Sequence, residues 1–177
     1  MGQKQQQPAQ NDYLMIEKRA QAEGYLTLAS FAKARYDSYV QYTDQTIKDW
    51  HLRDAEAVLP AAAARTYIDF EHDIANNREP IYCIVAMIPC DQLWPWLAKE
   101  LQSDAGPNNL YSFWITGNNS WHGAHRLDNF IDLWFAEQPQ VYDLNQALYI
   151  YRGCMIGELN FFKSACGQPL TPMPKPQ

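Results

Sequence analysis

Apolar side chains recur at steps of three and four along most of this chain, which is the spacing of a single helix face. The first such stretch runs from residue 12 to about residue 42 and includes Leu14, Leu28 and Phe31. Gly24 interrupts the stretch, at a cost of about 1 kcal/mol relative to alanine inside a helix. We therefore expect a helical region with a bend or a close helix contact near that glycine.

The same periodicity predicts further helices downstream, separated by turn residues and by prolines that suit a first helical turn. These expected helices cover residues 43–58, 60–75, 80–101, 110–115, 121–135 and 143–165. Few β-branched residues alternate anywhere in the sequence, so no strand is expected. Because the loops are short, consecutive helices should pack antiparallel, and we predict an all-α bundle of about six helices.

The two ends of the chain differ from its middle in composition. Residues 1–10 are rich in glutamine and carry no apolar pattern, which predicts a disordered tail. Residues 167–177 contain four prolines and cannot be helical, so they form either a flexible tail or one strapped against the bundle. No linker divides the rest, so residues 11–166 are expected to form one domain.

Composition and charge narrow the classes of partner. The net charge of the 177-residue chain is -6, which argues against nucleic acid because such binding needs a clustered basic face. We find no apolar run of membrane-spanning length and no apolar core of a secretory signal. The four cysteines form no CxxC pair, which is typical of reduced thiols. We expect a cytoplasmic protein that binds neither nucleic acid nor membrane.

The segment from Ile81 to Leu101 holds the first candidate for chemistry. Pro89 removes one N–H from this expected helix and predicts a bend there. Cys90 follows directly, and Trp94 lies one turn further on. A cysteine in these surroundings is either a buried structural residue or a nucleophile in an aromatic pocket. In the second case we expect a reactive, partly shielded thiolate.

Glu158 is the second candidate, because it lies late in the last expected helix among apolar residues. Phe161 and Phe162 follow it by three and four residues and share its helix face. A carboxyl group held in an apolar cleft has a raised pKa and can act as a general acid. On a solvent-facing edge of the helix, the same glutamate would be an ordinary surface residue.

Three segments of the chain resemble the thiaminase II (TenA) family. The segment AMIPCDQLWPWLAKEL, which begins at Ala86, resembles that family's A-L-L-P-C-x-x-L-Y helix. The segment from Tyr111 to Ile115 resembles its Y-x-x-W-I motif, and residues 157–162 resemble its E-x-x-F-W motif. The order and spacing of the three segments also agree with the family.

The resemblance implies a heme-oxygenase-like bundle that hydrolyses an aminopyrimidine (a thiamin breakdown product) or a related small heterocycle, with no cofactor. It implies that Cys90 attacks the pyrimidine ring and that Glu158 gives a proton to the leaving group. Members of the family are commonly homo-oligomers, so a homo-oligomer is expected. The residues that the resemblance places around the substrate are Asp12, Trp94, Tyr111, Asn118 and Phe162.

Several pocket positions differ from the family pattern. The family's Q-D-x-x-Y segment can be aligned with residues 11–15, which keeps Asp12 but lacks the tyrosine, or with residues 23–27, which keeps neither. Trp94 and Asn118 stand where the family has pocket tyrosines. These differences support a second hypothesis, in which the same fold binds a small molecule without catalysis.

A third hypothesis is a heme-oxygenase-like di-iron oxidase. The residues that could supply its ligands are Glu71, His72, Asp73, His122, His125 and Asp128. His122 and His125 are three residues apart and share a helix face. Di-iron sites in bundles usually take several carboxylates from separate helices, so a polar stripe facing solvent is the alternative, and we assign no metal site.

Overall fold

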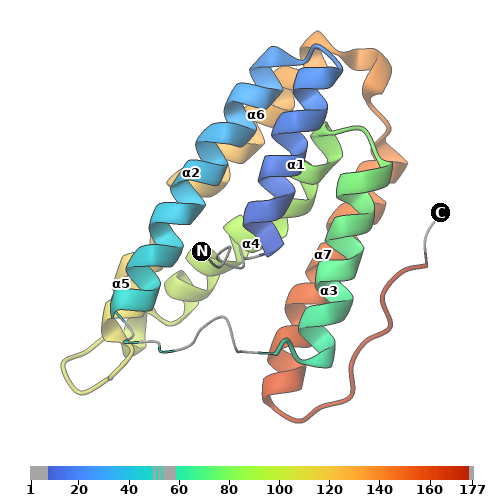
Figure 1. Cartoon of the computed structure of the whole chain (residues 1–177). Helices are drawn as coiled ribbons and strands as arrows, with labels where there is room; N and C mark the ends of the chain where they lie inside the picture. The colour runs from blue at the N-terminus through green and yellow to red at the C-terminus, as the bar shows by residue number, and fades with distance from the viewer. Residues whose placement is uncertain (1–7, 50, 52, 54–58, 176–177) are drawn as a thin grey trace.

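The computed structural model describes residues 8–49, 51, 53 and 59–175, and within these ranges the regular structure is helical, with no strand (Figure 1). The prediction of an all-α bundle is confirmed. The α-helices are α1 (Pro8–Ala22), α2 (Leu26–Asp49), α3 (Ala62–Asn77), α4 (Ile81–Glu100), α5 (Ser112–Asn118), α6 (His122–Glu137) and α7 (Leu144–Ala165). Two short 3-10 helices, η2 (Gln102–Asp104) and η3 (Pro139–Val141), lie between them. Helix α5 has 7 residues and is shorter than the other α-helices that the structure describes.

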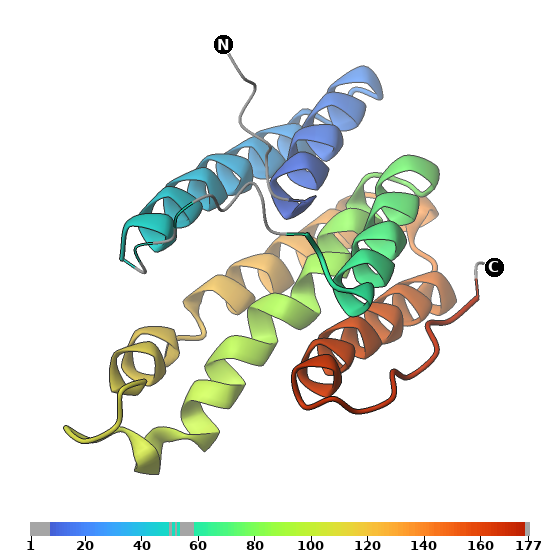
Figure 2. The ribbon, with the colours of Figure 1, turned by 60° about the horizontal axis from the view of Figure 1, so that its bottom comes forward.

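Helix α4 lies at the centre of the bundle. It packs against α1, α3, α5, α6 and α7, and two views show it between the α1–α2 pair and the α3–α7 pair (Figures 1 and 2). Every residue from Ile81 to Met87 is buried. The helix continues through Pro89 and Pro95. Since proline has no N–H, two backbone carbonyls of α4 lack their usual amide donor beside the candidate nucleophile.

Helix α4 also corrects the expectation that no segment is long and apolar enough to cross a membrane. By length and composition alone, its 20 residues pass that test, with a mean hydropathy of 1.2. However, 56% of this apolar window is buried inside the bundle. The core helix of a globular protein has the same properties, so the test is weak evidence for a membrane span.

The beginning of the chain is helical earlier than expected. Helix α1 starts at Pro8, so residues 8–10 belong to it rather than to a tail, while residues 1–7 lie outside the described residues. The turn that contains Gly24 separates α1 from α2, where the periodicity placed an interruption. The two helices form an antiparallel pair (Figure 1).

Helix α2 ends at Asp49, whereas the sequence pattern extended helical character to residue 58. Of residues 50–58, the structure describes His51 and Arg53, which lie in a turn and a bend. The others lie outside the described residues.

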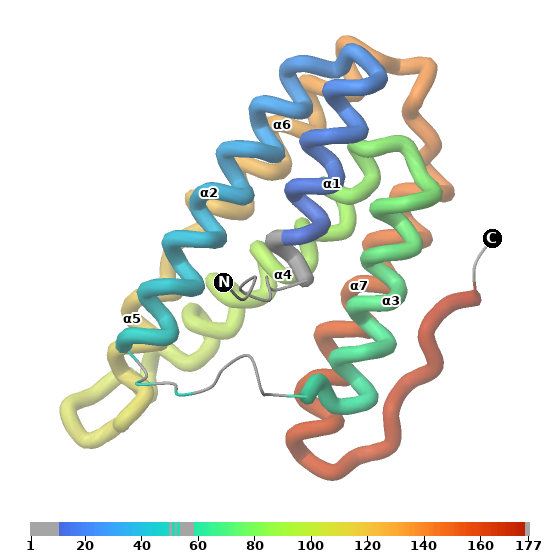
Figure 3. Tube along the Cα trace, in the orientation of Figure 1, coloured from blue at the N-terminus to red at the C-terminus, as the bar shows by residue number. Residues whose placement is uncertain are grey.

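The proline-rich end folds back beside α7 (Figure 3). Thr171 fixes it there, because its backbone N–H donates to Asn160 Oδ1 at 2.8 Å and its carbonyl accepts from Asn160 Nδ2 at 2.9 Å. Lys163 Nζ also donates to the Thr171 hydroxyl at 2.8 Å. Asn160 is 2% exposed. The sequence left open a flexible tail or one held against the bundle, and the described part of this segment is held against the bundle.

Candidate functional site

Cys90 on α4 and Glu158 on α7 meet where these two helices pack together. The Cys90 thiol hydrogen-bonds to the Glu158 carboxyl group. Glu158 is 3% exposed, while Cys90 is only partly buried. The indole Nε1 of Trp94, one turn along α4, donates to Cys90 Sγ at 3.2 Å. Three residues selected from the sequence therefore form one cluster.

Tyr67 of α3 holds the Glu158 carboxyl group from another side. Its hydroxyl donates to Glu158 Oε1 at 3.1 Å. The Tyr67 ring lies directly over Gly157, where an added Cβ would come within 2.5 Å of the ring Cγ. Gly153, one turn earlier on α7, accommodates the ring of Phe70 in the same way. Helix α3 can approach α7 this closely because both positions lack a side chain, and the approach brings the hydroxyl to the carboxyl group.

Two further acids, Glu71 on α3 and Asp12 on α1, interact with this part of the protein. Glu71 lies one turn after Tyr67 on α3, and the charges of Asp12 and Glu158 both act on its carboxyl group. Asp12 on α1 is fully buried, and His72 Nε2 lies 3.3 Å from its Oδ1. We call these three interacting carboxyl groups the acid row; Asp12 and Glu158 are buried, and Glu71 is partly buried.

Burial governs the titration of the thiol and of its carboxyl partner. Burial raises the pKa of Cys90 above its ordinary value, and the charge of Glu158 adds to the increase, whereas the hydrogen bond from Trp94 lowers it. The expected resting thiolate is therefore wrong, because a raised pKa keeps the sulfur protonated. Burial also raises the pKa of Glu158, while hydrogen bonds from Tyr67 and Cys90 lower it.

The other two acids of the row are affected in the same direction. Burial raises the pKa of Asp12 to about 6, although nearby His72 opposes the increase. Burial raises the pKa of Glu71 to about 8, and the charges of Asp12 and Glu158 on either side contribute. At neutral pH, Asp12 is therefore ionised and Glu71 is mostly protonated.

This arrangement is suited to general acid–base assistance of a sulfur nucleophile. A protonated thiol becomes a nucleophile when an adjacent base takes its proton. Glu158 lies where such a base would be needed for Cys90, because the two groups are hydrogen-bonded. Once protonated, the same carboxyl group can give the proton to a leaving group. The protein therefore contains a carboxyl group and a thiol in contact, which is the pair that such chemistry requires.

A buried ion pair fixes α4 next to Cys90. Arg35 of α2 donates to Asp91 Oδ2 at 2.7 Å, and the two side chains are 9% and 12% exposed. Tyr39 donates to the other Asp91 oxygen at 3.4 Å, and Arg35 Nε contacts the Tyr13 hydroxyl at 3.5 Å. Because Asp91 directly follows Cys90, this network sets the position of the thiol.

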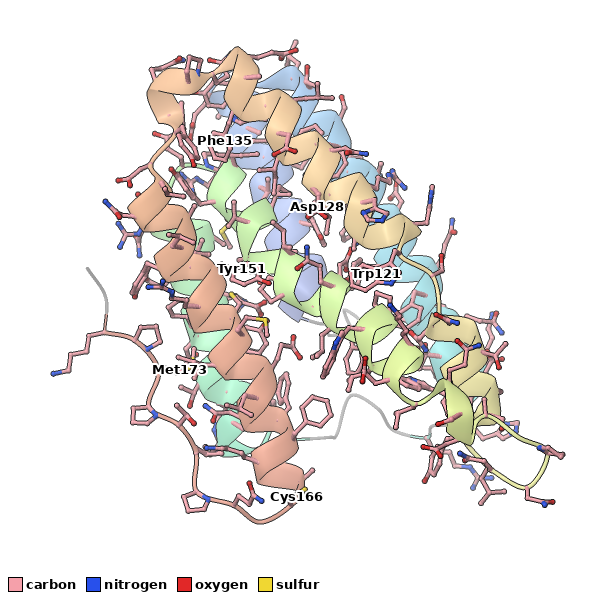
Figure 4. All side chains as sticks on the ribbon, turned by 180° about the vertical axis from the view of Figure 1, so that it is seen from behind. Trp121, Asp128, Phe135, Tyr151, Cys166 and Met173 are labelled. Carbon is pink, nitrogen blue, oxygen red and sulfur yellow. The ribbon has the colours of Figure 1, made fainter. Side chains whose placement is uncertain are left out.

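A second network joins α4 to α6 and α7, and two of its members, Asp128 and Tyr151, are labelled in Figure 4. Tyr151 of α7 donates to Gln92 Oε1 at 3.1 Å, and Gln92 Nε2 donates to Asp128 of α6 at 3.3 Å. Gln92 follows Cys90 by two residues. The thiol therefore lies on a helix segment that is hydrogen-bonded to α2, α6 and α7.

Three predicted substrate-binding residues, Tyr111, Asn118 and Phe162, make other contacts than the Cys90 thiol. Tyr111 is 62% exposed and lines a pocket of about 430 Å³ with Trp114, and Trp114 packs edge-on against Trp94. Asn118 ends α5 and donates to the Trp114 carbonyl at 2.9 Å. Phe162 is 43% exposed on α7. None of the contacts described for these three residues involves the Cys90 thiol.

Asp12, the fourth predicted substrate ligand, is inside the protein but has a protein partner. Its carboxyl group is paired with His72 rather than with the thiol. Residues 23–27, the alternative alignment of the same motif, contain the turn between α1 and α2. Of the two alignments, only the first places an acid in the interior.

The residues considered for a di-iron site are spread over the bundle. His122 and His125 are exposed on α6, and His125 Nδ1 lies 4.0 Å from Asp128 Oδ2. His72 is paired with Asp12 on the other side of the bundle. Within the described ranges, no group of three or more His, Cys, Asp or Glu side chains could hold a metal ion.

The sequence analysis missed Tyr67 and Arg35, and it assigned Glu71 only to a metal set. Tyr67 looked like a core aromatic residue, because its hydroxyl partner lies on a distant helix. The sequence did contain one usable signal. Tyr67 and Glu71 are four residues apart, and so are Cys154 and Glu158, so each pair shares a helix face and the two faces could pack together. For Arg35 no local signal existed, since its helix carries other charged residues of similar spacing.

No model of a known protein family matches this sequence, and a search of curated proteins finds no match.

Proposed function

We propose that this protein is a thiol-dependent hydrolase of the thiaminase II type that acts on an aminopyrimidine or a related small heterocycle. The observation that supports the proposal is the hydrogen bond between the Cys90 thiol and the Glu158 carboxyl group, on helices far apart in the sequence. The motif resemblance assigns these two residues as nucleophile and acid. Their contact supplies the geometry that such a pair requires.

The reaction that we propose begins with proton transfer from the Cys90 thiol to Glu158 as the sulfur bonds to a ring carbon. Electrons from the opened ring double bond then expel the amine on the exocyclic carbon, and Glu158 gives its proton to that amine. Water adds to the exocyclic carbon, and its proton returns to Glu158. Finally the carbon–sulfur bond breaks, the ring regains its aromaticity, and the sulfur takes the proton back.

The direct test is incubation with thiamin and with its aminomethylpyrimidine fragment, followed by chromatography of the products. We expect a hydroxymethylpyrimidine product, and its loss in Cys90→Ser and Glu158→Gln. The matched controls are Cys166→Ser, which changes an exposed thiol, and Glu100→Gln, which changes an exposed carboxylate on α4. Absence of product from the wild-type protein at high concentration would refute the proposal.

One observation favours a binding protein as the second candidate. Tyr111 and Asn118, which should orient a pyrimidine, have no described contact with the Cys90 cluster. Orientation of a substrate can account for several kcal/mol of a reaction barrier, so the loss of positioning groups would weaken catalysis first. Thermal shifts with thiamin-related compounds that are not consumed would support this candidate.

We further propose that the chain forms a homo-oligomer through the outer face of α7. Leu148, Met155, Leu159 and Phe162 are 37–46% exposed there, although α7 already buries its opposite face. A helix that is apolar on two faces is typical of a buried position. Light scattering coupled to size exclusion should give more than one chain per particle, and Leu159→Glu should reduce that number.

A further inference from the structure

A pocket of about 430 Å³ lies where η2 and α5 pack against α4, and its volume is in the range of small-molecule sites. Neither Cys90 nor Glu158 is among the described residues that line it. Trp114 of the lining packs edge-on against Trp94, and it is Trp94 that donates to Cys90 Sγ. A ligand in this pocket therefore contacts a different set of side chains from the thiol cluster. The described lining residues are Leu101, Asp104, Asn109, Tyr111, Trp114 and Ile115.

Hydrogen bonds within the loop between η2 and α5 shape this pocket. Asn109 Nδ2 donates to the Asp104 carbonyl at 2.9 Å, and Asn109 Oδ1 accepts from the Tyr111 N–H at 2.8 Å. Further along the loop, the Gly106 N–H donates to the Ser112 hydroxyl at 2.8 Å. These bonds set the positions of Asp104 and Tyr111 relative to each other before any ligand binds. A pocket formed in advance costs a ligand less ordering entropy.

The walls of the pocket combine aromatic rings with one negative charge. Tyr111 is 62% exposed at the pocket, and Trp114 supplies the second ring. Asp104 is the charged residue among the described ones that line it, and its carboxylate has no hydrogen bond or ion pair within the described part of the chain. Aromatic faces and a carboxylate both attract an ammonium group. An anion is repelled by the same carboxylate, and a neutral molecule gains nothing from its charge.

We propose that this pocket binds an organic cation, in which an ammonium group is carried on a small apolar body. The ammonium group lies beside the Asp104 carboxylate and the Tyr111 ring, and the apolar body rests against Leu101 and Ile115. The proposal gives Tyr111 a ligand other than the pyrimidine that the motif resemblance assigned to it. It does not rest on the proposed hydrolysis, because the described lining contains neither the nucleophile nor the acid of that reaction.

The test compares three compounds of similar shape and different charge at pH 7, namely phenethylammonium, phenethyl alcohol and hydrocinnamate. Binding to the full chain is followed through the indole N–H resonance of Trp114 in ¹H–¹⁵N NMR spectra, which Trp114→Phe assigns. The cation should bind about threefold or more tightly than the alcohol, because the ring and the carboxylate each favour its charge. The anion should bind most weakly.

Two variants locate the origin of this preference. Asp104→Asn should weaken binding of the cation about twofold to fivefold and leave that of the alcohol unchanged. Tyr111→Leu keeps an apolar wall but removes the ring face, so it should also reduce the preference for the cation. Both positions are exposed, so neither change disturbs the core. Glu100→Gln, which removes an exposed carboxylate outside the described lining, is the control and should match the wild type.

Three outcomes would overturn the proposal. Equal affinity for the cation and the alcohol would mean that the pocket selects only for apolar surface. A loss in Glu100→Gln as large as that in Asp104→Asn would assign the preference to general surface charge. No movement of the Trp114 resonance with any of the three compounds at millimolar concentration would mean that the pocket takes no such ligand. Because these titrations use no turnover, a protein that hydrolyses no pyrimidine can still bind the cation, and an active hydrolase can fail to bind it.

Discussion

At the scale of single residues, the surroundings of Cys90 decide its reactivity more than the cysteine itself does. Burial and the Glu158 charge keep the sulfur protonated, and the indole N–H of Trp94 is the group on α4 that opposes them. The site therefore differs from one in which a thiolate is preformed. In the proposed reaction, the thiolate of Cys90 exists only while a neighbouring base holds the proton.

Replacing Trp94 by phenylalanine should make the thiol less reactive. The change keeps most of the aromatic surface but removes the N–H that donates to Cys90 Sγ. Because that hydrogen bond lowers the Cys90 pKa, its loss raises the pKa further. A net hydrogen bond of about 1 kcal/mol predicts alkylation slower by roughly fivefold at a fixed pH. Trp96→Phe, at a 49% exposed position, is the control, and a faster reaction in Trp94→Phe would contradict the argument.

The ion pair of Arg35 and Asp91 should be far more sensitive to substitution than a surface pair. Arg35→Met leaves the Asp91 carboxyl group buried without its cation, and such a loss costs about 3–5 kcal/mol of unfolding free energy. Lys33→Met breaks a pair with Asp37 on the same helix, where the side chains are 47% and 51% exposed. That control should cost less than about 1 kcal/mol in urea unfolding. Similar losses in both variants would refute the structural role assigned to Arg35.

At the scale of helices, the contact between α3 and α7 depends on two positions without side chains. Gly157→Ala should destabilise the protein by about 1–3 kcal/mol, although alanine is the better helix former. The reason is the contact of 2.5 Å that its Cβ would make with the Tyr67 ring. Gly117→Ala in α5 is the control, because nothing lies within 4 Å of that position. Thermal unfolding that ranks the two variants in the opposite order would contradict this packing.

The strap at the end of the chain depends on one side chain of α7. Asn160→Ala removes both hydrogen bonds to the Thr171 backbone, so the Thr171 amide should exchange its hydrogen with solvent at least about tenfold faster. Thr171→Val removes only the contact with Lys163 and should keep the strap in place. Hydrogen exchange read by mass spectrometry separates the two cases. Unchanged exchange in Asn160→Ala would show that other contacts hold the segment.

At the scale of the whole molecule, the sequence predicted what depends on periodicity. Most helix boundaries agree within a few residues, and Asp143, where the last helix was expected to begin, caps α7. The Cys90 and Glu158 pair was identified through motifs, because no pattern within one helix shows which distant helix it meets. The place of Tyr67 and Glu71 near Glu158 was not predicted, for the same reason. The substrate-binding role of Tyr111 stays a prediction, because motif order alone says nothing about the distance in space between Tyr111 and Cys90.

The row of buried acids also predicts how the stability of the whole protein changes with pH. In the folded state the Glu71 pKa is raised from 4.5 to about 8, so between these values the folded protein binds more protons than the unfolded chain. Stability from this group is therefore complete below about pH 4.5 and is lost as pH rises toward 8, with a slope of at most about 1.4 kcal/mol per pH unit. Asp12 adds a smaller loss between its ordinary 3.8 and about 6.

Urea unfolding should accordingly give a lower free energy of unfolding at pH 8 than at pH 5. In Glu71→Gln the residue is neutral in both states, so the decrease between pH 6 and pH 8 should largely vanish, while the part below pH 6 should shrink to the contribution of Asp12. Asp69→Asn should keep the full wild-type decrease, because its carboxylate is exposed. Equal stability of the wild type at pH 5 and pH 8 would contradict this prediction. If Glu71→Gln lost stability as steeply as the wild type, Glu71 would not be the group that holds the extra proton in the folded protein.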